Sequence, residues 1–235
     1  METTESGRQS ETQNQQSRIK IWYDAIRPKT LWAAASPVLM GTAIAFSDGS
    51  FHALAALTAL VGALLIQIGT NFANDYFDYV KGVDTEERLG PTRATAAGLV
   101  TPAAMKKAFI LIFALAFLSG LYLIARGGWP IFIVGIFSIL FGILYTAGPY
   151  PLGYNGLGDI FVLIFFGPVA VGGTYYVQAL SINQTVLLAG LAPGLISTAL
   201  LTVNNLRDIY TDKAAGKRTL AVRFGLRFTR LEYLV

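Results

Sequence analysis

The chain has 235 residues, of which 54% are hydrophobic and only 14% are charged, with a net charge of +4 and no cysteine. In soluble domains about a quarter of the residues are charged, so this composition excludes an ordinary soluble domain. The lack of cysteine excludes disulfides and thiolate metal sites. The basic residues are interleaved with acids next to apolar segments, so no nucleic-acid partner is expected.

Residues 1–20 are polar, and we expect them to form a disordered tail. The rest of the chain, 21–235, contains six apolar runs of about 18 or more residues, the length of membrane-spanning helices. The runs cover residues 31–47, 52–73, 108–125, 129–147, 158–180 and 185–203. A soluble protein of this size could not bury all six, which disfavours that alternative. Because backbone groups in lipid must be paired internally, we expect an all-α, polytopic transmembrane helix bundle.

Lysine and arginine are concentrated before the first run and after the second and the sixth, whereas the loops near Asp48 and Ser181 carry neither. Arg126 is a mild exception. By the positive-inside rule, the N-terminus and both large polar blocks are predicted to be cytoplasmic. The expected location is the cell (plasma) membrane, with the lipid bilayer as the surrounding partner.

The polar blocks after the second and sixth runs begin with similar motifs, NFANDYFD and TVNNLRDIYTD. In each motif an asparagine stands four residues before an aspartate, and another acid and then basic residues follow. The two pairs are Asn74 with Asp78 and Asn204 with Asp208; the following acids are Asp84 and Asp212. This is a weak internal repeat whose polar ends lie on the same side of the membrane.

Residues four apart share one face of a helix, so acids at this spacing favour a cationic ligand between them. Carboxylate and amide oxygens suit Mg²⁺, which usually binds a few carboxylates together with substrate phosphates. The candidate metal ligands and catalytic residues are Asn74, Asp78, Asp84, Asp208 and Asp212. The candidate diphosphate-binding residues are Arg88, Arg93, Lys217 and Arg218, with Arg27 and Lys29 as weaker ones that could instead anchor the first helix. The alternative is that the acids are solvated loop charges, and Asp75 could be a ligand or only a neighbour.

The loop YTAGPYPLGYNGLGD, from Tyr145 to Asp159, is rich in glycine and proline. Pro149 and Pro151 are predicted to end the fourth helix. The three tyrosines of this loop are candidates either to line the path of an aromatic substrate or to form an interfacial belt, and the belt suits Tyr154 better than Tyr145. Asp159 is either a substrate contact or a helix N-cap.

Three segments carry a resemblance to a known family: NDYFDYVKGVDTEERLGPTRATAAGLVTP, YTAGPYPLGYNGLGDIFVLIFFGPVAVGGTYY and NNLRDIYTDKAAGKRTLAVRFG. Together they resemble the 1,4-dihydroxy-2-naphthoate polyprenyltransferase branch of the UbiA-type intramembrane prenyltransferases, from about Trp22 to the last residue. The resemblance implies nine membrane helices around a central cavity. Six of about nine are expected here, so the chain is expected to be incomplete at its C-terminus.

The resemblance also implies the reaction. Mg²⁺ would hold a polyprenyl diphosphate between the two acidic motifs, and the prenyl group would pass to 1,4-dihydroxy-2-naphthoate with loss of CO₂ and pyrophosphate, giving demethylmenaquinol. Asp78 and Asp84 are six residues apart, with Gly82 between them, as expected for the naphthoate branch. No obligate protein partner is implied.

Other functions remain as alternatives. One is prenyl transfer to another aromatic acceptor, 4-hydroxybenzoate or homogentisate. The Tyr-x-x-x-Lys element of 4-hydroxybenzoate enzymes is absent, because Pro149 stands four residues after Tyr145. A CDP-alcohol phosphotransferase would need its acids in one run, but here they form two distant clusters. A polytopic transporter would place acids near the middle of the membrane, whereas these lie at the ends of the runs.

Overall fold

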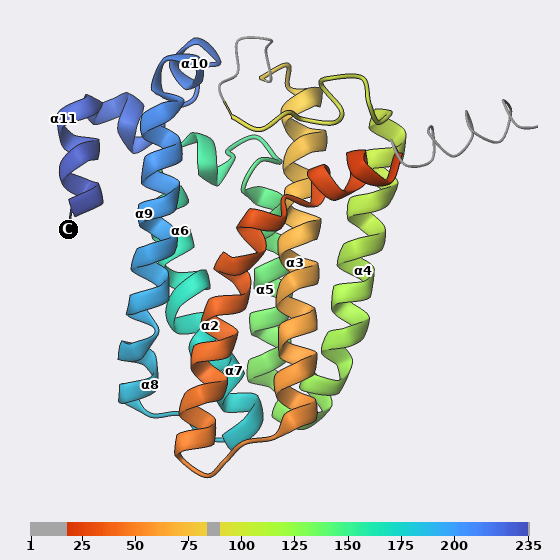
Figure 1. Ribbon diagram of the computed structural model, residues 1–235, viewed down its shortest axis with the longest axis vertical. Helices are drawn as coiled ribbons and strands as arrows, with labels where there is room; N and C mark the ends of the chain where they lie inside the picture. Colours follow the sequence, from red (N-terminus) through yellow and green to blue (C-terminus); the bar gives the residue numbers. More distant parts are fainter. Residues whose placement is uncertain (1–17, 84–89, 235) are drawn as a thin grey trace, which may run out of the picture.

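The structure is a computed structural model that describes residues 18–83 and 90–234. Within these ranges the regular secondary structure is all helical, and Figure 1 shows most of the helices standing side by side as a bundle. The predicted all-α bundle is therefore confirmed. A helix already includes residues 18–20, which the sequence had placed in the disordered tail, and it continues to residue 26.

Ten α-helices follow this first segment. They are α2 (Pro28–Ser47), α3 (Ala53–Val80), α4 (Pro102–Gly127), α5 (Trp129–Leu144), α6 (Gly158–Ile164), α7 (Ala170–Ala179), α8 (Gln184–Ala189), α9 (Leu191–Arg207), α10 (Ile209–Ala214) and α11 (Leu220–Leu234). A single 3₁₀ turn, Leu152–Tyr154, precedes α6, and a π-helical turn, Phe165–Val169, joins α6 to α7.

Five helical segments of the described chain are long and apolar enough to cross a membrane. They are Pro28–Ser47, Ala53–Val80, Pro102–Gly127, Gly158–Ala179 and Gln184–Arg207. The sixth expected span is represented by α5, whose 16 residues extend only about 24 Å at the rise of an α-helix. The hydrocarbon core of a bilayer is about 30 Å thick.

Helix α5 ends at Leu144, ahead of the two prolines that were predicted to end it. The Lys81 ammonium donates to the carbonyl oxygens of Thr146 (2.6 Å) and Gly148 (3.1 Å). Gly148 also has a positive φ of 79°, which suits a glycine. The helix therefore ends where the end of α3 binds the next residues of the chain, before Pro149 is reached.

Two interrupted helices pack against each other at their interruptions. The π-helical turn between α6 and α7 faces the junction between α8 and α9. A Cβ atom added to Gly194 would lie 2.5 Å from the Leu163 carbonyl oxygen, and one added to Gly190 would lie 2.7 Å from the Cα of Pro168. Small residues let helix backbones approach closely in lipid, where apolar burial provides little driving force between helices.

We expect Gly194→Ala to destabilise this crossing by about 1–3 kcal/mol, since the added methyl group overlaps a backbone oxygen. Gly120→Ala in α4 is the matched control, because its added Cβ meets nothing within 4 Å. Alanine is the better helix former, so the control should be neutral or slightly stabilising. Thermal unfolding in the same detergent measures both variants, and equal melting temperatures would contradict the close crossing.

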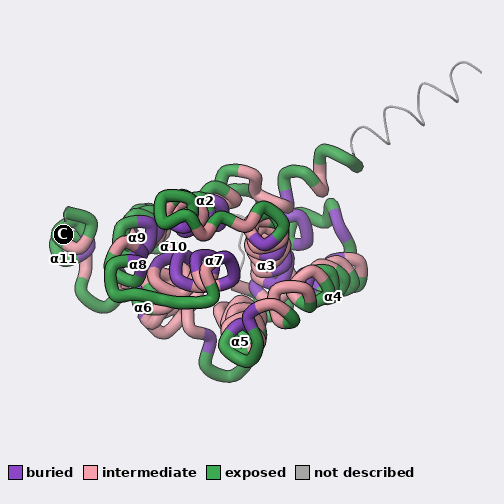
Figure 2. The backbone as a smooth tube through the Cα atoms, turned by 90° about the horizontal axis from the view of Figure 1, so that it is seen from below, coloured by how far each residue is buried: buried purple, intermediate pink, exposed green. Residues whose placement is uncertain are grey.

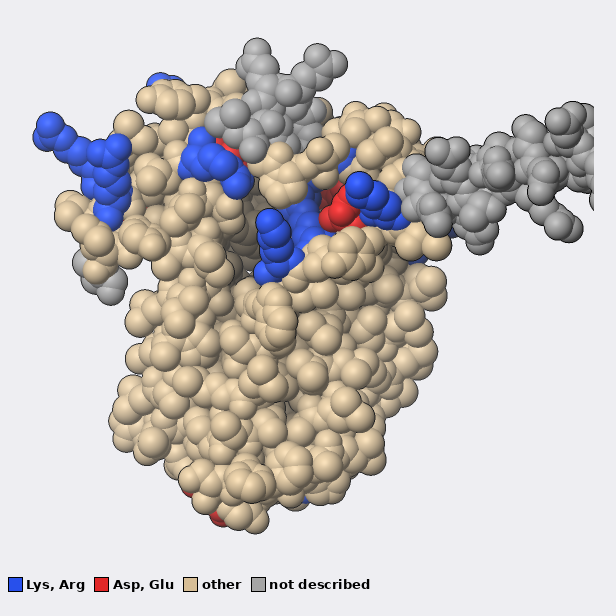
Figure 3. Space-filling model, viewed as in Figure 1, with Lys and Arg blue, Asp and Glu red and all other residues tan. Residues whose placement is uncertain are grey.

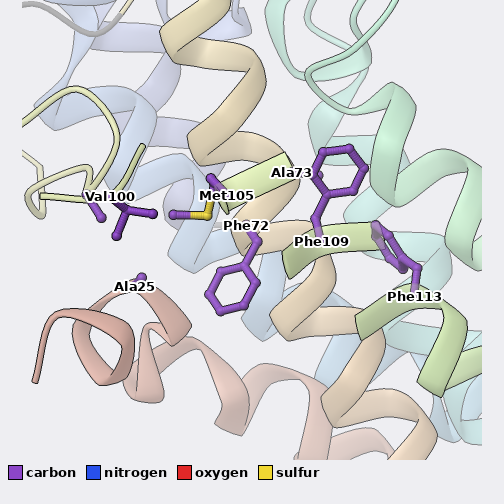
Figure 4. Close-up of a cluster of buried hydrophobic side chains, with 8 residues drawn as sticks. Ala25, Phe72, Ala73, Val100, Met105, Phe109 and Phe113 are labelled. Atoms are coloured by element: carbon purple, nitrogen blue, oxygen red, sulfur yellow. The ribbon is translucent and has the colours of Figure 1, made fainter. Parts of the chain in front are cut away.

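One cluster of buried side chains joins the N-terminal helix to the bundle. Its members are Ala25, Phe72, Ala73, Ala94, Val100, Met105, Phe109 and Phe113, most of which are labelled in Figure 4. Trp22 packs edge-on against Phe72, with ring centroids 5.5 Å apart. In Figure 2 buried residues line the sides of the helices that face one another, and exposed residues lie on the outside. The first helix is thus fixed across α3 and α4.

Most of the charged side chains visible in Figure 3 gather at one end of the molecule, above a large surface without charges. We call this end, which includes the end of α3, the end of α9 and α10, the charged end. Asp48 and Arg126 belong to the opposite end, where Arg126 donates to the carbonyl oxygens of Val177 and Gln178. The charged side chains of the described residues therefore lie toward the two ends of the bundle.

Candidate active site

A polar cavity of about 220 Å³ opens at the charged end. The ends of α3 and α9, helix α10 and the loop after α5 form its walls. Its lining residues are Arg27, Asn74, Asp78, Val83, Arg93, Tyr145, Thr146, Gly153, Tyr154, Leu201, Asn205, Asp208, Thr211, Asp212, Lys217 and Thr219. Residues from both acidic motifs thus reach one cavity, although the motifs lie far apart in the sequence.

The first motif lies on α3, which continues past its apolar part to Val80. Asn74 and Asp78 are one helical turn apart and line the same cavity. Asp78 is only 2% exposed, and each of its carboxylate oxygens is held by a different donor. Arg93 Nη2 lies 2.7 Å from Oδ2, and the Tyr154 hydroxyl donates to Oδ1 at 2.5 Å. The Asn74 side-chain oxygen accepts from the Thr146 hydroxyl at 2.8 Å.

Asp75, whose role the sequence left open, lies on α3 and binds the backbone of the neighbouring loop. It is 3% exposed, and its two carboxylate oxygens accept hydrogen bonds from the backbone amides of Ala94 and Thr95, at 2.9 and 3.0 Å. These bonds fix the segment that carries Arg93. Asp75 therefore supports the Arg93–Asp78 ion pair from outside the cavity lining.

Asp75→Asn should lower the stability of the protein by about 1–3 kcal/mol, because one buried amide loses its acceptor. Since Asp75 does not line the cavity, the Mg²⁺ concentration that gives half-maximal activity should stay close to the wild-type value. Thermal unfolding and a Mg²⁺ titration of activity test the two parts separately. A large shift in the Mg²⁺ requirement would instead assign Asp75 to the ion site.

The second motif lies where α9 ends. Asp208 stands between α9 and α10, and the Asp212 amide donates to its carbonyl oxygen at 2.8 Å, so both residues face the cavity. Arg207 makes two contacts to the Asp208 carboxylate, at 2.7 and 2.6 Å. Lys217 Nζ lies 3.1 Å from Asp212 Oδ1. With the Arg93–Asp78 pair, the three acids that line the cavity, Asp78, Asp208 and Asp212, are each paired with a base.

Lys81, at the end of α3, lies beside the cavity without lining it. Burial lowers the pKa of its ammonium group, and the nearby Asp78 carboxylate opposes that shift. Its Nζ lies 5.0 Å from the centroid of the Tyr154 ring, and Lys217 Nζ lies at the same distance from the same ring. Of the two roles that the sequence left open for Tyr154, the structure favours a place in the cavity lining, because the loop after α5 folds over the end of α3.

Two apolar cavities continue the site into the bundle. The first, of about 280 Å³, shares Asn74 and Tyr145 with the polar cavity and is otherwise lined mostly by apolar side chains from α2, α3, α5 and the α6–α7 segment. The second, of about 150 Å³, shares Ala63, Ile66, Ser138 and Ala170 with the first. A polar chamber at the charged end thus leads into an apolar passage along the bundle.

The donor set of the polar cavity fits Mg²⁺ in its chemistry, because Asn74, Asp78, Asp208 and Asp212 all present oxygen atoms. Within residues 18–83 and 90–234, however, no group of three or more acidic or histidine side chains is placed to hold an ion by itself. Mg²⁺ commonly binds one or two carboxylates and takes its remaining ligands from phosphates and water. The residues present therefore fit Mg²⁺ when a diphosphate shares the cavity.

Of the other predicted site residues, one lines the cavity, two lie outside its lining and two are outside the described residues. Arg27 lines the cavity from the junction before α2, with a left-handed φ of 58°. The side chains of Lys29 and Arg218 are exposed and outside the cavity lining, although the Arg218 amide donates to the Tyr154 carbonyl oxygen at 2.6 Å. Asp84 and Arg88 lie outside the described residues.

The two candidate contacts for the aromatic substrate also differ. Tyr145 lines both the polar and the first apolar cavity. Asp159 is 6% exposed and is absent from the lining of all three cavities. It lies in the first turn of α6, whose N-cap is Leu157, so Asp159 does not have the N-cap role that was one of the two left open by the sequence. An acid in this turn is still favoured by the helix dipole.

Sequence reasoning missed several residues that line the cavity, including Thr146, Asn205 and Thr211, and two bases that contact lining residues, Lys81 and Arg207. Asn205, rather than the exposed Asn204, lines the cavity. The asparagine–aspartate spacing selected Asn204, but α9 presents the next residue to the cavity. The Thr146 and Tyr154 contacts depend on how an irregular loop folds back over α3, for which the sequence has no periodic signal.

Comparisons with known proteins show the family to which the chain belongs. The model of the UbiA prenyltransferase family matches residues 34–235. A 1,4-dihydroxy-2-naphthoate octaprenyltransferase of Escherichia coli strain K12 is 46% identical over 220 residues, which cover 91% of this chain and 71% of that protein. A protein of the same name from Mycobacterium tuberculosis strain H37Rv is 43% identical over 215 residues, covering 90% and 72% of the two chains.

Solved structures support the same fold. A UbiA homologue from Archaeoglobus fulgidus bound to DMAPP and Mg²⁺ superposes with a TM-score of 0.64 at 16% identity, over 91% of this chain and 72% of that one. The chain therefore belongs to the UbiA prenyltransferase family, and it is a multi-pass membrane protein.

Proposed function

We propose that the protein transfers a polyprenyl group from polyprenyl diphosphate to 1,4-dihydroxy-2-naphthoate, releasing pyrophosphate and CO₂ and giving demethylmenaquinol. The observation that carries this proposal is the joined pair of cavities, one polar with both acidic motifs and one apolar, which share Asn74 and Tyr145. A polyprenyl diphosphate has the same division into a charged head and an apolar chain.

The bases of the polar cavity bind and orient the diphosphate head. Arg93, Lys217 and Arg27 line the cavity and can donate charge-assisted hydrogen bonds to its oxygens. They stabilise negative charge as it develops on the leaving group. Lys29 and Arg218, with exposed side chains, are further candidates, as is Arg88, which lies outside the described residues.

Asn74, Asp78, Asp208 and Asp212 would hold Mg²⁺, with Asp84 as the remaining candidate ligand outside the described residues. Bound there with the diphosphate, the ion supplies positive charge that stabilises the departing pyrophosphate. The four described side chains would hold the ion by presenting oxygen atoms from two walls of one cavity. A Mg²⁺ requirement of the reaction is part of this proposal.

The apolar cavities receive the isoprenoid chain and exclude water from the reacting carbon. When the carbon–oxygen bond to the diphosphate breaks, positive charge develops on the first isoprene carbon. A naphthoate ring carbon donates its electrons to that carbon, and the ring carboxylate leaves as CO₂. Phe141, Phe161 and Phe165 are among the apolar side chains of the first cavity. They keep out the water that would otherwise trap the cation as a prenyl alcohol.

The naphthoate acceptor is supported by the names of relatives that are 43–46% identical over about nine-tenths of the chain. Tyr145 stands at the border of the two cavities, where an aromatic ring would meet the first isoprene carbon. We further propose that the charged end is cytoplasmic in the cell membrane, because most of the lysine and arginine residues flank the spans there.

The test is prenyl transfer in membranes that contain the protein, with radiolabelled polyprenyl diphosphate and 1,4-dihydroxy-2-naphthoate, with and without Mg²⁺. Parallel reactions use 4-hydroxybenzoate and homogentisate. We expect a Mg²⁺-dependent prenylated product from the naphthoate alone, together with release of CO₂ from carboxyl-labelled acceptor. Product from another acceptor only would overturn the choice of naphthoate, and no product with any acceptor would overturn the transferase proposal.

A further inference from the structure

Tyr154 contacts both halves of the polar cavity. Its hydroxyl donates to Asp78 Oδ1 at 2.5 Å, while Arg93 holds the other oxygen of the same carboxylate. With both oxygens held by different donors, the Asp78 side chain has one fixed orientation. This contact joins Tyr154 to the first acidic motif.

The Tyr154 ring and backbone contact the segment that follows the second motif. Lys217 Nζ lies 5.0 Å from the ring centroid, and the Arg218 amide donates to the Tyr154 carbonyl oxygen at 2.6 Å. Lys81, at the end of α3, places its own ammonium 5.0 Å from the same ring. The Tyr154 ring therefore makes cation–π contacts with two ammonium groups, one from each side of the cavity.

The loop is built to bring this tyrosine into the site. Tyr154 ends the 3₁₀ turn that starts at Leu152. A Cβ atom at Gly153 would lie 2.6 Å from the Tyr145 ring, and Gly156, with a φ of 73°, would place one 3.1 Å from the Arg218 carbonyl oxygen. Only a residue without a side chain fits at these two positions, so the backbone packs tightly on either side of Tyr154.

An aromatic face attracts an ammonium group without neutralising it. A carboxylate partner would hold Lys217 equally well but would compete with a phosphate for its charge. Asp212 is such a partner, at 3.1 Å. If the Asp212 carboxylate binds a metal ion instead of Lys217, the Tyr154 ring still holds Lys217 in the cavity, with the charge of the lysine available to a phosphate.

We propose that Tyr154 is a positioning residue that aligns the two halves of the diphosphate site, its hydroxyl fixing Asp78 and its ring fixing Lys217. The inference deepens the proposed function and rests on its diphosphate site. It predicts separate effects for the two parts of the side chain. Loss of the hydroxyl should weaken the binding of Mg²⁺, and loss of the ring should weaken the binding of the diphosphate.

The experiment measures binding of radiolabelled inorganic pyrophosphate to the protein in lipid nanodiscs over a range of Mg²⁺ concentrations. Tyr154→Phe keeps the ring, so at saturating Mg²⁺ its pyrophosphate affinity should stay within about twofold of wild type, while the half-saturating Mg²⁺ concentration rises about threefold to tenfold. Tyr154→Leu should weaken pyrophosphate binding about tenfold or more even at saturating Mg²⁺.

Tyr150→Leu is the matched control, because Tyr150 is on the same loop and 59% exposed. It should bind pyrophosphate as wild type does. A second arm tests the ring contact directly: Lys217→Met should weaken binding in the wild type but add little in the Tyr154→Leu background, because the lysine has already lost its position. In steady-state assays, Tyr154→Leu should raise the KM for polyprenyl diphosphate more than it lowers kcat.

Wild-type affinity in Tyr154→Leu, or an equal loss in Tyr150→Leu, would overturn the role of Tyr154. Fully additive effects of the Tyr154 and Lys217 substitutions would also overturn it. If the variants follow the expected pattern but no aromatic acceptor is prenylated, the role of Tyr154 stands and the proposed transferase reaction fails. If wild-type protein does not bind pyrophosphate with Mg²⁺, both proposals are overturned.

Discussion

Asp78→Asn and Asp208→Asn should each reduce Mg²⁺-dependent prenyl transfer by about 10²–10³-fold, the loss typical of removing one group that stabilises developing charge. Asparagine keeps the size of the side chain but removes the negative charge. The two residues lie on different walls of one cavity, so either substitution by itself should cause this loss of activity. Initial rates in membranes at saturating naphthoate, over a Mg²⁺ range, provide the measurement.

Asp48→Asn is the control for these substitutions. Asp48 lies at the end opposite to the cavity, where its carboxylate accepts a hydrogen bond from the Tyr175 hydroxyl at 2.9 Å. The asparagine oxygen can accept the same bond, so both folding and activity should persist. If Asp78→Asn and Asp208→Asn were as active as Asp48→Asn, the acids would be ordinary charges at helix ends and the metal site would be wrong.

Ala63→Leu should make the protein discriminate against long polyprenyl donors. Ala63 lines both apolar cavities, and it precedes Asn74 by eleven residues of α3, or about 16 Å along the helix. A larger side chain there narrows the passage between the two cavities. The KM for a long-chain diphosphate should rise about tenfold or more, by the usual cost of overpacking. The KM for geranyl diphosphate, which is too short to reach this point, should change little.

Ala114→Leu in α4 makes the same chemical change at an exposed position. It should leave the KM values for both donors unchanged, because its side chain faces outward from the bundle. Competition between a long and a short donor in one reaction provides the sharpest readout for both variants. Equal losses for the two donors in Ala63→Leu would mean that the second cavity does not receive the isoprenoid chain.

The parts of the structure that the sequence predicts well are those with a periodic or compositional signal. Long apolar runs separated by charged blocks identify the membrane helices, because lipid demands both length and internal hydrogen bonding. The spacing of Asn74 and Asp78 also sufficed to place both on one side of α3, because the helix continues to Val80. These inferences depend on neighbours along one helix.

The parts that the sequence does not predict depend on contacts between distant segments. Asp75 and Asp78 are alike in sequence terms, but one supports a loop and the other faces the cavity. The difference arises because residues 93–95 fold back against α3. Likewise, no local pattern around Leu144 indicates that Lys81, at the end of α3, binds the carbonyl oxygens of Thr146 and Gly148 in the loop after α5.

The border that Asn74 and Tyr145 form between the polar and apolar cavities has a consequence for the two products. In the proposed reaction, bond cleavage at that border would leave pyrophosphate in a chamber that opens at the charged end. The prenylated ring, without a charged group to retain it there, has affinity only for the apolar side. The products therefore separate into water and lipid respectively. Their local concentrations at the border stay low, so recombination is suppressed and the transfer proceeds in one direction.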